Sequence, residues 1–270
     1  MFDPALVPPE LRTAEDALSA RIEEAGLNAA QPPEQLLYDG WLLRHSPGKA
    51  RRARSVNAIA EGRLPLQEKI DHCRDFYAQA GLPCLFRITP FSRPAGLDEV
   101  LAQRGFVAED ETRVMTLPLV SAGWPSMHEA REIGIEEFAQ QVGALRGSPT
   151  QQIAAHVVRL KASAPLMKRA KRLALVESGC IVAVGQSLTE GELVGLYDIV
   201  TAERARGRGL GTALAAELLR RAQGDGARTA YLQVSADNIA ARRDYRKLGF
   251  ADCYAYWYRS EADGVPERQA

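Results

Sequence analysis

The sequence predicts a mixed α/β (α+β) protein made of two tandem lobes, and three observations lead there. Segments with helical and with strand periodicity alternate along most of the chain. Turn-forming residues gather at 121–126, where the sequence reads SAGWPS. After that point the same order of elements begins again, and Gly249-Phe250 aligns with Gly105-Phe106 at a spacing of 144 residues, which suggests a duplication. The predicted units are a first lobe over 1–120, a linker over 121–126, a second lobe over 127–260 and a loose polar tail over 261–270.

The first lobe opens with a helical pattern in ALSARIEEA and continues with strands. The segments YDGWLLRH and RRARSVNAIA alternate in polarity around Ser46-Pro47-Gly48-Lys49, which predicts a hairpin turning there. In PLQEKIDHCRDFYAQAG the apolar residues fall on one helical face, and PCLFRIT follows as a strand. A helix in GLDEVLAQRG and a strand in FVAEDETRVMTLPL complete this lobe.

The second lobe is predicted to start with two helices, IEEFAQQVGALRG and TQQIAAHVVRLKASA. KRLALVESG and CIVAVGQSL read as paired strands, and LVGLYDIVT reads as a third, strongly apolar strand. A helix follows with Leu210, Leu214 and Leu218 at four-residue intervals, ending at Gly224-Asp225-Gly226. The strand ARTAYLQVS, the short helix NIAARRDYRKLG and the strand ADCYAYWYR close the lobe.

Composition and charge exclude several classes of protein. Thirty-four basic residues balance thirty-four acidic ones in 270, so the formal net charge is zero and nucleic acid is not favoured as a partner. The four cysteines have no CxxC spacing and the four histidines form no HExxH motif, so we expect no metal site and a reducing cytoplasm. Neither a secretory signal nor an apolar run of about 20 residues is present, so we expect no membrane association.

A glycine- and arginine-rich turn precedes the helix of the second lobe. Between a buried strand and that helix the chain reads Arg206-Gly207-Arg208-Gly209-Leu210-Gly211-Thr212. The first turn of a helix has unpaired N–H donors and a partial positive charge, so it stabilises a bound anion, and glycine side chains leave the approach open. The spacing fits neither the G-x-G-x-x-G fingerprint nor the Walker loop. A flexible turn with a solvated basic rim is the alternative interpretation.

A second pattern lies about thirty residues downstream, in YLQVSADNIAARRDYRKLGF. Asn238 and Tyr245 are seven residues apart, two helical turns, so both can line one cleft. Asn238 stands at a helix start, where it can also be a simple cap. Tyr245 can be a core aromatic, but its neighbours in the sequence are charged, which favours a position at the rim of a polar cleft.

The two patterns together resemble the GNAT superfamily of acetyltransferases. R-x-x-G-x-G resembles its acyl-CoA pyrophosphate loop, and N-x-x-A-x-x-x-Y before Leu248-Gly249-Phe250 resembles its following helix. The resemblance implies lobes with a mixed, mostly antiparallel twisted sheet flanked by helices. It implies acetyl-CoA as the cofactor, held in a gap where the strand YLQVS splays from its neighbour. One departure is Glu203, where the superfamily often has proline.

The resemblance assigns site residues to this sequence. Tyr245 is expected to protonate the coenzyme A thiolate, and Asp198 is the first candidate for the base, with a structural carboxylate as its alternative. Glu192, Glu203 and His156 are weaker candidates for the base, and we expect no metal ligand. The backbone of Ile199–Thr201 is expected to face the acetyl group and to supply an oxyanion donor. The residues expected to bind the cofactor are Ile199, Val200, Thr201, Arg206, Gly207, Arg208, Gly209, Leu210, Gly211, Thr212, Asn238 and Tyr245.

The first lobe lacks both patterns. In the 144-residue register Pro65 takes the position of Gly209 and Leu101 takes that of Tyr245. We therefore expect a degenerate lobe without acetyl-CoA, which braces the sheet or helps to wall the acceptor pocket. Its basic run RHSPGKARRARS is interpreted as a solvated hairpin, with attraction of an acidic acceptor or nucleic acid as the alternative. The chain resembles bacterial tandem GNAT proteins in which only the second lobe keeps the cofactor motifs.

The predicted function is an N-acetyltransferase that moves an acetyl group from acetyl-CoA to a primary amine of a small molecule or a peptide. A non-catalytic acyl-CoA sensor is the alternative, and a phosphate- or nucleic-acid-binding module is a third hypothesis. The sequence indicates neither the identity of the amine nor the oligomeric state.

Overall fold

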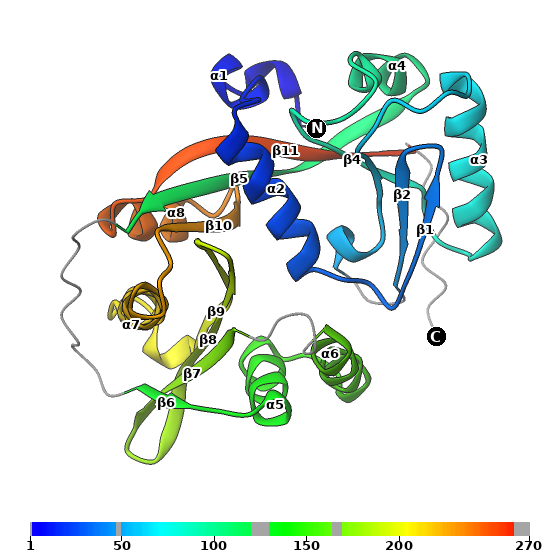
Figure 1. Ribbon diagram of the computed structural model, residues 1–270. Helices are drawn as coiled ribbons and strands as arrows, with labels where there is room; N and C mark the ends of the chain where they lie inside the picture. The colour runs from blue at the N-terminus through cyan, green and yellow to red at the C-terminus, as the bar shows by residue number, and fades with distance from the viewer. Residues whose placement is uncertain (1, 47–49, 120–129, 164–168, 262–270) are drawn as a thin grey trace.

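The computed structural model describes residues 2–46, 50–119, 130–163 and 169–261. Within them one mixed sheet runs through the molecule, with helices packed on its faces (Figure 1). The prediction of a mixed α/β fold is confirmed. The strands are β1 (Glu34–Tyr38), β2 (Trp41–His45), β3 (Val56–Ala58), β4 (Leu85–Ile88), β5 (Phe106–Pro118), β6 (Ala130–Glu132), β7 (Ala170–Glu177), β8 (Cys180–Glu190), β9 (Leu193–Thr201), β10 (Thr229–Ser235) and β11 (Ala251–Glu261).

The helices are α1 (Pro9–Arg12), α2 (Ala17–Ala29), α3 (Leu66–Gln79), α4 (Leu97–Gln103), α5 (Ile135–Arg146), α6 (Thr150–Ser163), α7 (Leu210–Gly224) and α8 (Ile239–Lys247), with short 3₁₀ turns η1 (Pro4–Leu6), η2 (Arg51–Ala53) and η3 (Glu203–Ala205). The helices and strands predicted from the sequence recur in the same order, but β1 and β6 were not predicted, and η2 occupies part of the predicted strand RRARSVNAIA. The predicted linker at 121–126, the turn residues 47–49 and the tail from residue 262 onward lie outside the described residues.

The order of the strands in the sheet is β1-β2-β3-β4-β11-β5-β10-β9-β8-β7-β6. The pairs β3–β4 and β9–β10 are parallel, and the other neighbouring pairs are antiparallel, so the sheet is mostly antiparallel as expected. The strand β11 lies between β4 and β5, while β5 lies between β11 and β10. Each half of the chain therefore places its last strand beside the other half.

The two halves follow one another at a constant spacing. Helix α3 begins at Leu66 and α7 at Leu210, and β4 begins at Leu85 and β10 at Thr229, in both cases 144 residues later. Conserving this spacing from one helix to the next strand fits the duplication inferred from the sequence. The division into lobes at stated residue numbers stays a prediction, because the boundary falls among residues that the structure does not describe.

The predicted pairing of YDGWLLRH with RRARSVNAIA is confirmed for β2 and β3, which are antiparallel neighbours, but a tighter hairpin turn at the start of the first segment was not predicted. The tight turn lies at Asp39-Gly40, where β1 pairs with β2 from Tyr38↔Trp41 onward. Both turn residues have positive φ, 41° and 84°, which is the geometry that an Asp-Gly dipeptide favours in a two-residue hairpin. Strand β2 also pairs with β3, but η2 lies between them in the sequence.

The two faces of the strands β7 to β9 are covered by different helices. Leu173 and Leu175 of β7 belong to the core cluster built on α7, whereas Ala174 belongs to the cluster built on α5 and α6. Successive side chains of a strand point to opposite faces, so α7 lies on one face and the pair α5 and α6 on the other (Figure 1). This separation defines two sides of the site described next.

Candidate active site

A gap opens in the sheet between β9 and β10. Their parallel pairing runs from Thr229↔Leu193 to Leu232↔Leu196 and ends there. Beyond that point β9 continues along β8 and β10 continues along β5, so each strand keeps one partner while losing the other. The separation expected for YLQVS is therefore present.

A β-bulge shapes the β9 side of this gap. Gln186 pairs with Tyr197 and Val184 pairs with Val200, so Asp198 and Ile199 together oppose Gly185. Asp198 has a φ of 51°, which an L-residue adopts at a cost of roughly 1–3 kcal/mol. A Cβ on Gly185 would lie 2.4 Å from Ile199 Cδ1, so a larger residue there would have to displace the Ile199 side chain. The bulge directs the Asp198 side chain toward α5 and the Ile199 side chain toward α7.

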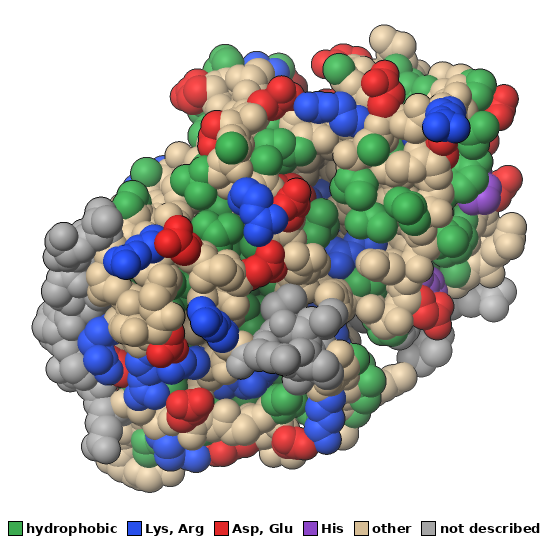
Figure 2. Space-filling view, in the orientation of Figure 1, with side chains coloured by type: hydrophobic (Ala, Val, Ile, Leu, Met, Phe, Trp, Pro, Cys, Tyr) green, Lys and Arg blue, Asp and Glu red, His purple; other side chains and the backbone are tan. Residues whose placement is uncertain are grey.

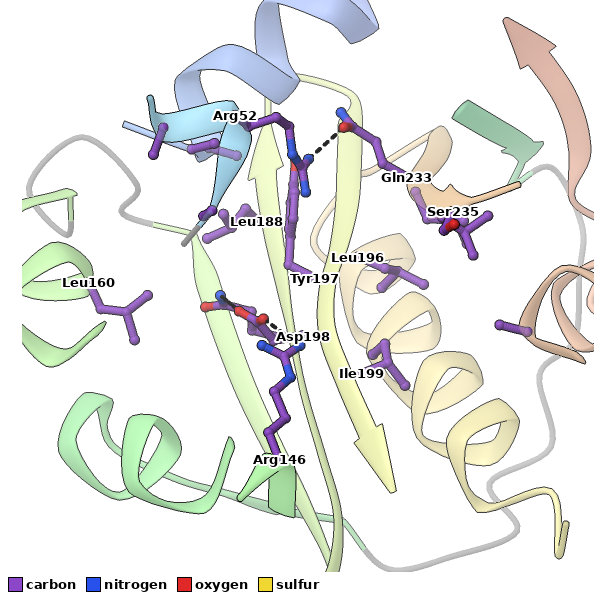
Figure 3. A pocket seen from close by; sticks show the side chains of 18 of the residues that line it. Arg52, Arg146, Leu160, Leu188, Leu196, Tyr197, Asp198, Ile199, Gln233 and Ser235 are labelled. Atoms are coloured by element: carbon purple, nitrogen blue, oxygen red, sulfur yellow. Dashed lines mark hydrogen bonds and ion pairs between the residues drawn. The ribbon is translucent and has the colours of Figure 1, made fainter. Parts of the chain in front are cut away.

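A cavity of about 470 Å³ occupies the gap and reaches both faces of the sheet (Figure 3). Leu196, Ile199 and Leu232, which pack toward α7, line one part. Tyr197, Asp198 and Gln186 line the part on the face of α5 and α6. Of the residues predicted for the site, the cavity wall contains Asp198, Ile199, Asn238 and Tyr245.

Asp198 is held by three polar neighbours. Its Oδ1 lies 2.9 Å from Arg146 Nη2, and its Oδ2 accepts a hydrogen bond of 3.2 Å from Gln186 Nε2. His156 Nε2 is 3.7 Å from the same Oδ2. Burial opposes ionisation, but the charges of Arg146, His156 and Arg159 and the hydrogen bond from Arg146 together outweigh it, and the pKa of Asp198 is lowered. Asp198 is therefore an ionised carboxylate at neutral pH.

His156 has the opposite character. Burial lowers the pKa of His156 to about 4, and nearby arginines oppose the effect of Asp198 on it. The imidazole is therefore neutral at pH 7 and keeps a lone pair on one nitrogen. The other two candidates for the base, Glu192 and Glu203, are exposed and are not among the residues lining the cavity.

Tyr245 lies on the side of the cavity that faces α7. Its ring packs against Phe250, with centroids 5.9 Å apart. Burial raises the pKa of Tyr245 to about 12, so the phenol stays protonated over the neutral range. Two turns of α8 away from Tyr245, Asn238 caps the helix by accepting a hydrogen bond of 3.1 Å from the Ala241 N–H. Asn238 thus acts as a cap and also lines the cavity, and its contact with the cofactor stays a prediction.

The start of α7 combines two glycines with positive φ. Gly207 and Gly209 have φ of 76° and 74°, and no side chain caps the helix at Gly209. A Cβ at Gly211 would lie 3.2 Å from Thr201 Oγ1, so the first turn of α7 approaches the end of β9 closely. The Leu210 side chain is buried in the core, which leaves only its backbone available to a ligand.

The arginines of this turn differ from one another. Arg208 makes a two-pronged ion pair with Glu177, with distances of 2.8 and 2.9 Å. Contact with a phosphate therefore requires Arg208 to exchange Glu177 for it. Arg206 is exposed. In the adjacent strand β9, Val200 packs against the cluster built on α5 and α6. In the described part of the chain, the residues Val200, Thr201 and 206–212 do not line the 470 Å³ cavity but lie next to it in sequence and packing.

Sequence reasoning missed most of the polar wall. The cavity also contains residues from separate segments, namely Arg52, Arg146, Arg159, Arg172, Gln186 and Gln233. Arg52 belongs to the basic run that was expected to be solvated, and that expectation is wrong for this side chain. Arg52 is half-buried, and its Nη1 donates a hydrogen bond of 2.5 Å to Gln233 Oε1 on β10 (Figure 3).

Two other kinds of site are absent from the described residues. No helix among them is long and apolar enough to cross a bilayer. Nor do three or more His, Cys, Asp or Glu side chains gather there in a way that could hold a metal ion. On the face in Figure 2, basic and acidic side chains lie interspersed, in keeping with the zero net charge.

Comparisons with known proteins agree with this geometry. Residues 19–259 match the family model described as probable histone acetyltransferase Rv0428c C-terminal. The chain is 32% identical over 234 residues to the uncharacterized N-acetyltransferase YobR of Bacillus subtilis, covering 81% of this chain and 89% of YobR.

Solved structures show the same fold. A GCN5-related N-acetyltransferase from Kribbella flavida superposes with a TM-score of 0.66 at 17% identity, over 94% of this chain and 98% of its own. A tandem GNAT protein from the clavulanic acid biosynthesis pathway gives a TM-score of 0.57 at 14% identity, over 75% of this chain and 70% of its own.

Proposed function

Because the chain belongs to the GNAT superfamily and is an acetyltransferase of that type, we propose that it transfers an acetyl group from acetyl-CoA to a primary amine of a small molecule or peptide. The observation that carries the proposal is the cavity that passes between β9 and β10. It joins the side on which α7 begins to the side on which Asp198 lies, so a donor and an acceptor entering from opposite faces meet in the gap.

The residues present fit a coenzyme A thioester. A thioester supplies an activated acetyl group whose carbonyl carbon an amine can attack. The uncapped first turn of α7 offers backbone N–H groups to a pyrophosphate, and the positive φ of Gly207 and Gly209 keeps side chains away from the approach. Thr201, Leu210, Gly211 and Thr212 complete this turn. We propose that Arg206 and Arg208 add charge at its rim and that Asn238 and Ala241 line the path of the pantetheine arm.

The bulge on β9 suits the charge that develops during transfer. A bulge leaves one residue outside the regular hydrogen-bond ladder, so backbone groups near Ile199 and Val200 are available to a ligand. We propose that a backbone N–H there stabilises the oxyanion formed at the acetyl carbonyl. Donors of this kind contribute roughly 10²–10³ in kcat.

Tyr245 and Asp198 handle the two protons of the reaction. As the amine nitrogen bonds to the acetyl carbon, the carbon–sulfur bond breaks and the thiolate needs a proton, which the protonated Tyr245 phenol supplies. The amine enters on the side of Asp198, whose ionised carboxylate attracts the ammonium form and accepts a proton from it. The proton taken up by Asp198 is released to solvent, and the second proton, which the nitrogen loses after it has attacked the acetyl carbon, replaces the proton that Tyr245 gave to the thiolate, so one proton is released overall.

Two measurements on the whole chain test the proposal. Coenzyme A should raise the melting temperature, and thiol release from acetyl-CoA should accelerate with at least one member of a diverse panel of amines and peptides. Stabilisation by coenzyme A without thiol release from any amine would indicate an acyl-CoA sensor instead. If coenzyme A gives no stabilisation at millimolar concentration, the assignment of the α7 turn is wrong.

A further inference from the structure

Four arginines surround the part of the cavity that lies on the face of α5 and α6. They come from four separate elements, with Arg52 in η2, Arg146 at the end of α5, Arg159 in α6 and Arg172 in β7. Among the described residues lining the cavity, Asp198 is the one carboxylate. The wall therefore carries a large excess of positive charge, although the chain as a whole is neutral.

The contacts of Arg52, Arg146 and Arg172 leave part of that positive charge available to a ligand. Arg146 is paired with Asp198, so the one carboxylate of the wall is already engaged. Arg52 donates to Gln233, which is uncharged. The Arg172 side chain makes no hydrogen bond or ion pair with another described residue, and its buried Nε has no partner among them. Arg172 is half-buried, and Glu132 acts on its charge without forming an ion pair with it, so the guanidinium is available to an anion from outside the chain.

The electrostatic coupling of these groups shows that they share one site. Besides burial, the charges of Arg159, Arg146 and Arg172 act to lower the pKa of His156. Burial lowers the pKa of Arg159, and the charges of Arg52 and Arg146 lower it further against the attraction of Asp198. Bringing like charges together costs free energy, and an anion bound between them would recover it.

The position of Arg172 separates this charge from the α7 turn. Arg172 pairs with Gln186 across β7 and β8, and Gln186 pairs with Tyr197 on β9. These three side chains lie in one row across the sheet. Arg172 is two residues from Ala174 and Gln186 is two residues from Val184, so the row lies on the face that packs against α5 and α6. Helix α7 packs on the opposite face. The coenzyme A pyrophosphate proposed at α7 is therefore not the partner of Arg172.

We infer that the amine acceptor carries an anionic group, a carboxylate or a phosphate, which Arg172 and Arg52 bind on the face of the sheet opposite to α7. This inference rests on the proposed acetyl transfer and specifies the class of its acceptor. The acceptor then spans the cavity, with its anionic group at the arginines and its amine toward Asp198 and the gap (Figure 3). Arginine recognises both anions through paired N–H donors, and a buried pair of this kind favours a ligand over its neutral analogue by at least tenfold.

Matched pairs of amines test the inference in the intact enzyme. Each pair differs in the anionic group alone: an amino acid and its amide for the carboxylate, and an amino sugar phosphate and the free amino sugar for the phosphate. We expect kcat/KM for thiol release to be at least tenfold higher for the anionic member of one pair, and the pair that shows it identifies the anion. Equal rates for both members, or faster turnover of the neutral ones, would overturn the inference while leaving acetyl transfer established.

Variants of the two cavity arginines test where the anionic group of the acceptor binds. Arg172→Gln and Arg52→Gln should each reduce the preference for the anionic acceptor at least tenfold through KM, with the dissociation constant of coenzyme A unchanged. Arg228→Gln is the matched control, because Arg228 is exposed and lies outside the cavity. A preference that survives in both cavity variants would place the anion elsewhere and contradict the assignment.

Direct binding keeps the inference testable if no amine in the panel is acetylated. With coenzyme A at saturation, inorganic phosphate or acetate at millimolar concentration should raise the melting temperature of the wild type and not that of Arg172→Gln. An equal response of the two proteins would refute an anion site at Arg172. A failure of thiol release alone would count against the proposed function and not against this site.

Discussion

The two repeats of the chain treat the same place in the sheet differently. In the second repeat the parallel pair β9–β10 ends at Leu196↔Leu232, and a cavity of about 470 Å³ lies beyond it. In the first repeat the parallel pair β3–β4 joins Val56↔Phe86 and Asn57↔Arg87, and the cavity beside it measures about 140 Å³. The first repeat keeps the scaffold, but the space beside its parallel pair is largely filled.

A buried ion pair fills the first repeat. Arg87 Nη2 donates a hydrogen bond of 3.0 Å to Glu23 Oε2, which also accepts one of 2.7 Å from the Tyr254 hydroxyl. The Arg87 guanidinium lies 3.8 Å from the centroid of the Tyr256 ring. The helix starts differ as well, since Pro65 precedes α3 where Gly209 precedes α7. Proline has no N–H and a fixed φ, so it cannot reproduce the open turn. In the first repeat Arg87 is paired with Glu23 and stabilises the fold. In the second repeat, we infer that Arg172 and Arg52 of the cavity wall bind an anionic ligand instead.

The largest effect in this comparison should come from breaking the internal pair of the first repeat. Glu23→Gln leaves the buried Arg87 charge without its counter-charge, which should lower the free energy of unfolding by about 3–5 kcal/mol. Urea denaturation measures it. The double variant Glu23→Gln with Arg87→Met should recover part of the loss, and coenzyme A affinity should change little in either. A loss below about 1 kcal/mol would mean that the pair does not hold α2 on the sheet.

Next in size is a pH effect confined to the second repeat. His156 has a pKa of about 4 in the folded protein against 6.5 in an unfolded chain, so between these values the unfolded state binds the extra proton. Stability should therefore fall by up to about 3 kcal/mol as the pH drops from 6.5 to 4. Asp198, with a lowered pKa, adds a further loss only below about pH 4. His156→Gln should flatten the profile between pH 6.5 and 4, and an unchanged slope there would show that another group is responsible.

The difference between the two helix starts predicts a smaller effect on binding. Gly209→Val places a branched side chain at a φ of 74° and in the approach to α7, so coenzyme A affinity should fall about 100-fold. Gly81→Val is the matched control, since Gly81 has a φ of 66° with open space around it in the first repeat. Calorimetric titration with coenzyme A compares the two. Similar affinity losses in both variants would attribute the effect to backbone strain in general.

The smallest effect is expected for a variant of Tyr245, whose position in the first repeat is occupied by Leu101. Tyr245→Phe removes one hydroxyl, so kcat for thiol release should fall about tenfold or more, with coenzyme A affinity retained. Tyr38→Phe, in the first repeat, is the control and should keep the wild-type rate. If Tyr245→Phe turns over at the wild-type rate, the leaving thiolate takes its proton from another group.

Local patterns made part of the site predictable. The turn before α7 and the spacing of Asn238 and Tyr245 on α8 each lie within a few residues of sequence, so their geometry follows from one helix start. The bulge had a local signal that we did not use, since Gly185 is an isolated glycine inside a strand. The turn at Asp39-Gly40 also had a local signal that we did not use, because an Asp-Gly pair between apolar segments favours a two-residue hairpin.

The arginine wall could not be predicted in the same way. Arg52 and Arg172 are 120 residues apart in sequence, and both line one cavity because η2 and β7 border it. No periodicity records such a contact, and each arginine in isolation has the sequence context of a solvated charge. The sheet order that brings them together depends on β11 entering between β4 and β5, a pairing between residues far apart in the chain.

That interlocking of β5 and β11 has a consequence for how the molecule can be dissected. Cutting the chain between the repeats would leave β4 without its neighbour β11 and β10 without its neighbour β5. Each fragment would then expose an unpaired strand edge, so either fragment produced by itself should be prone to aggregate. Co-expressed, the two pieces should reassemble by trading strands, as complementing fragments do. The repeats are thus distinct in ancestry and indivisible in folding.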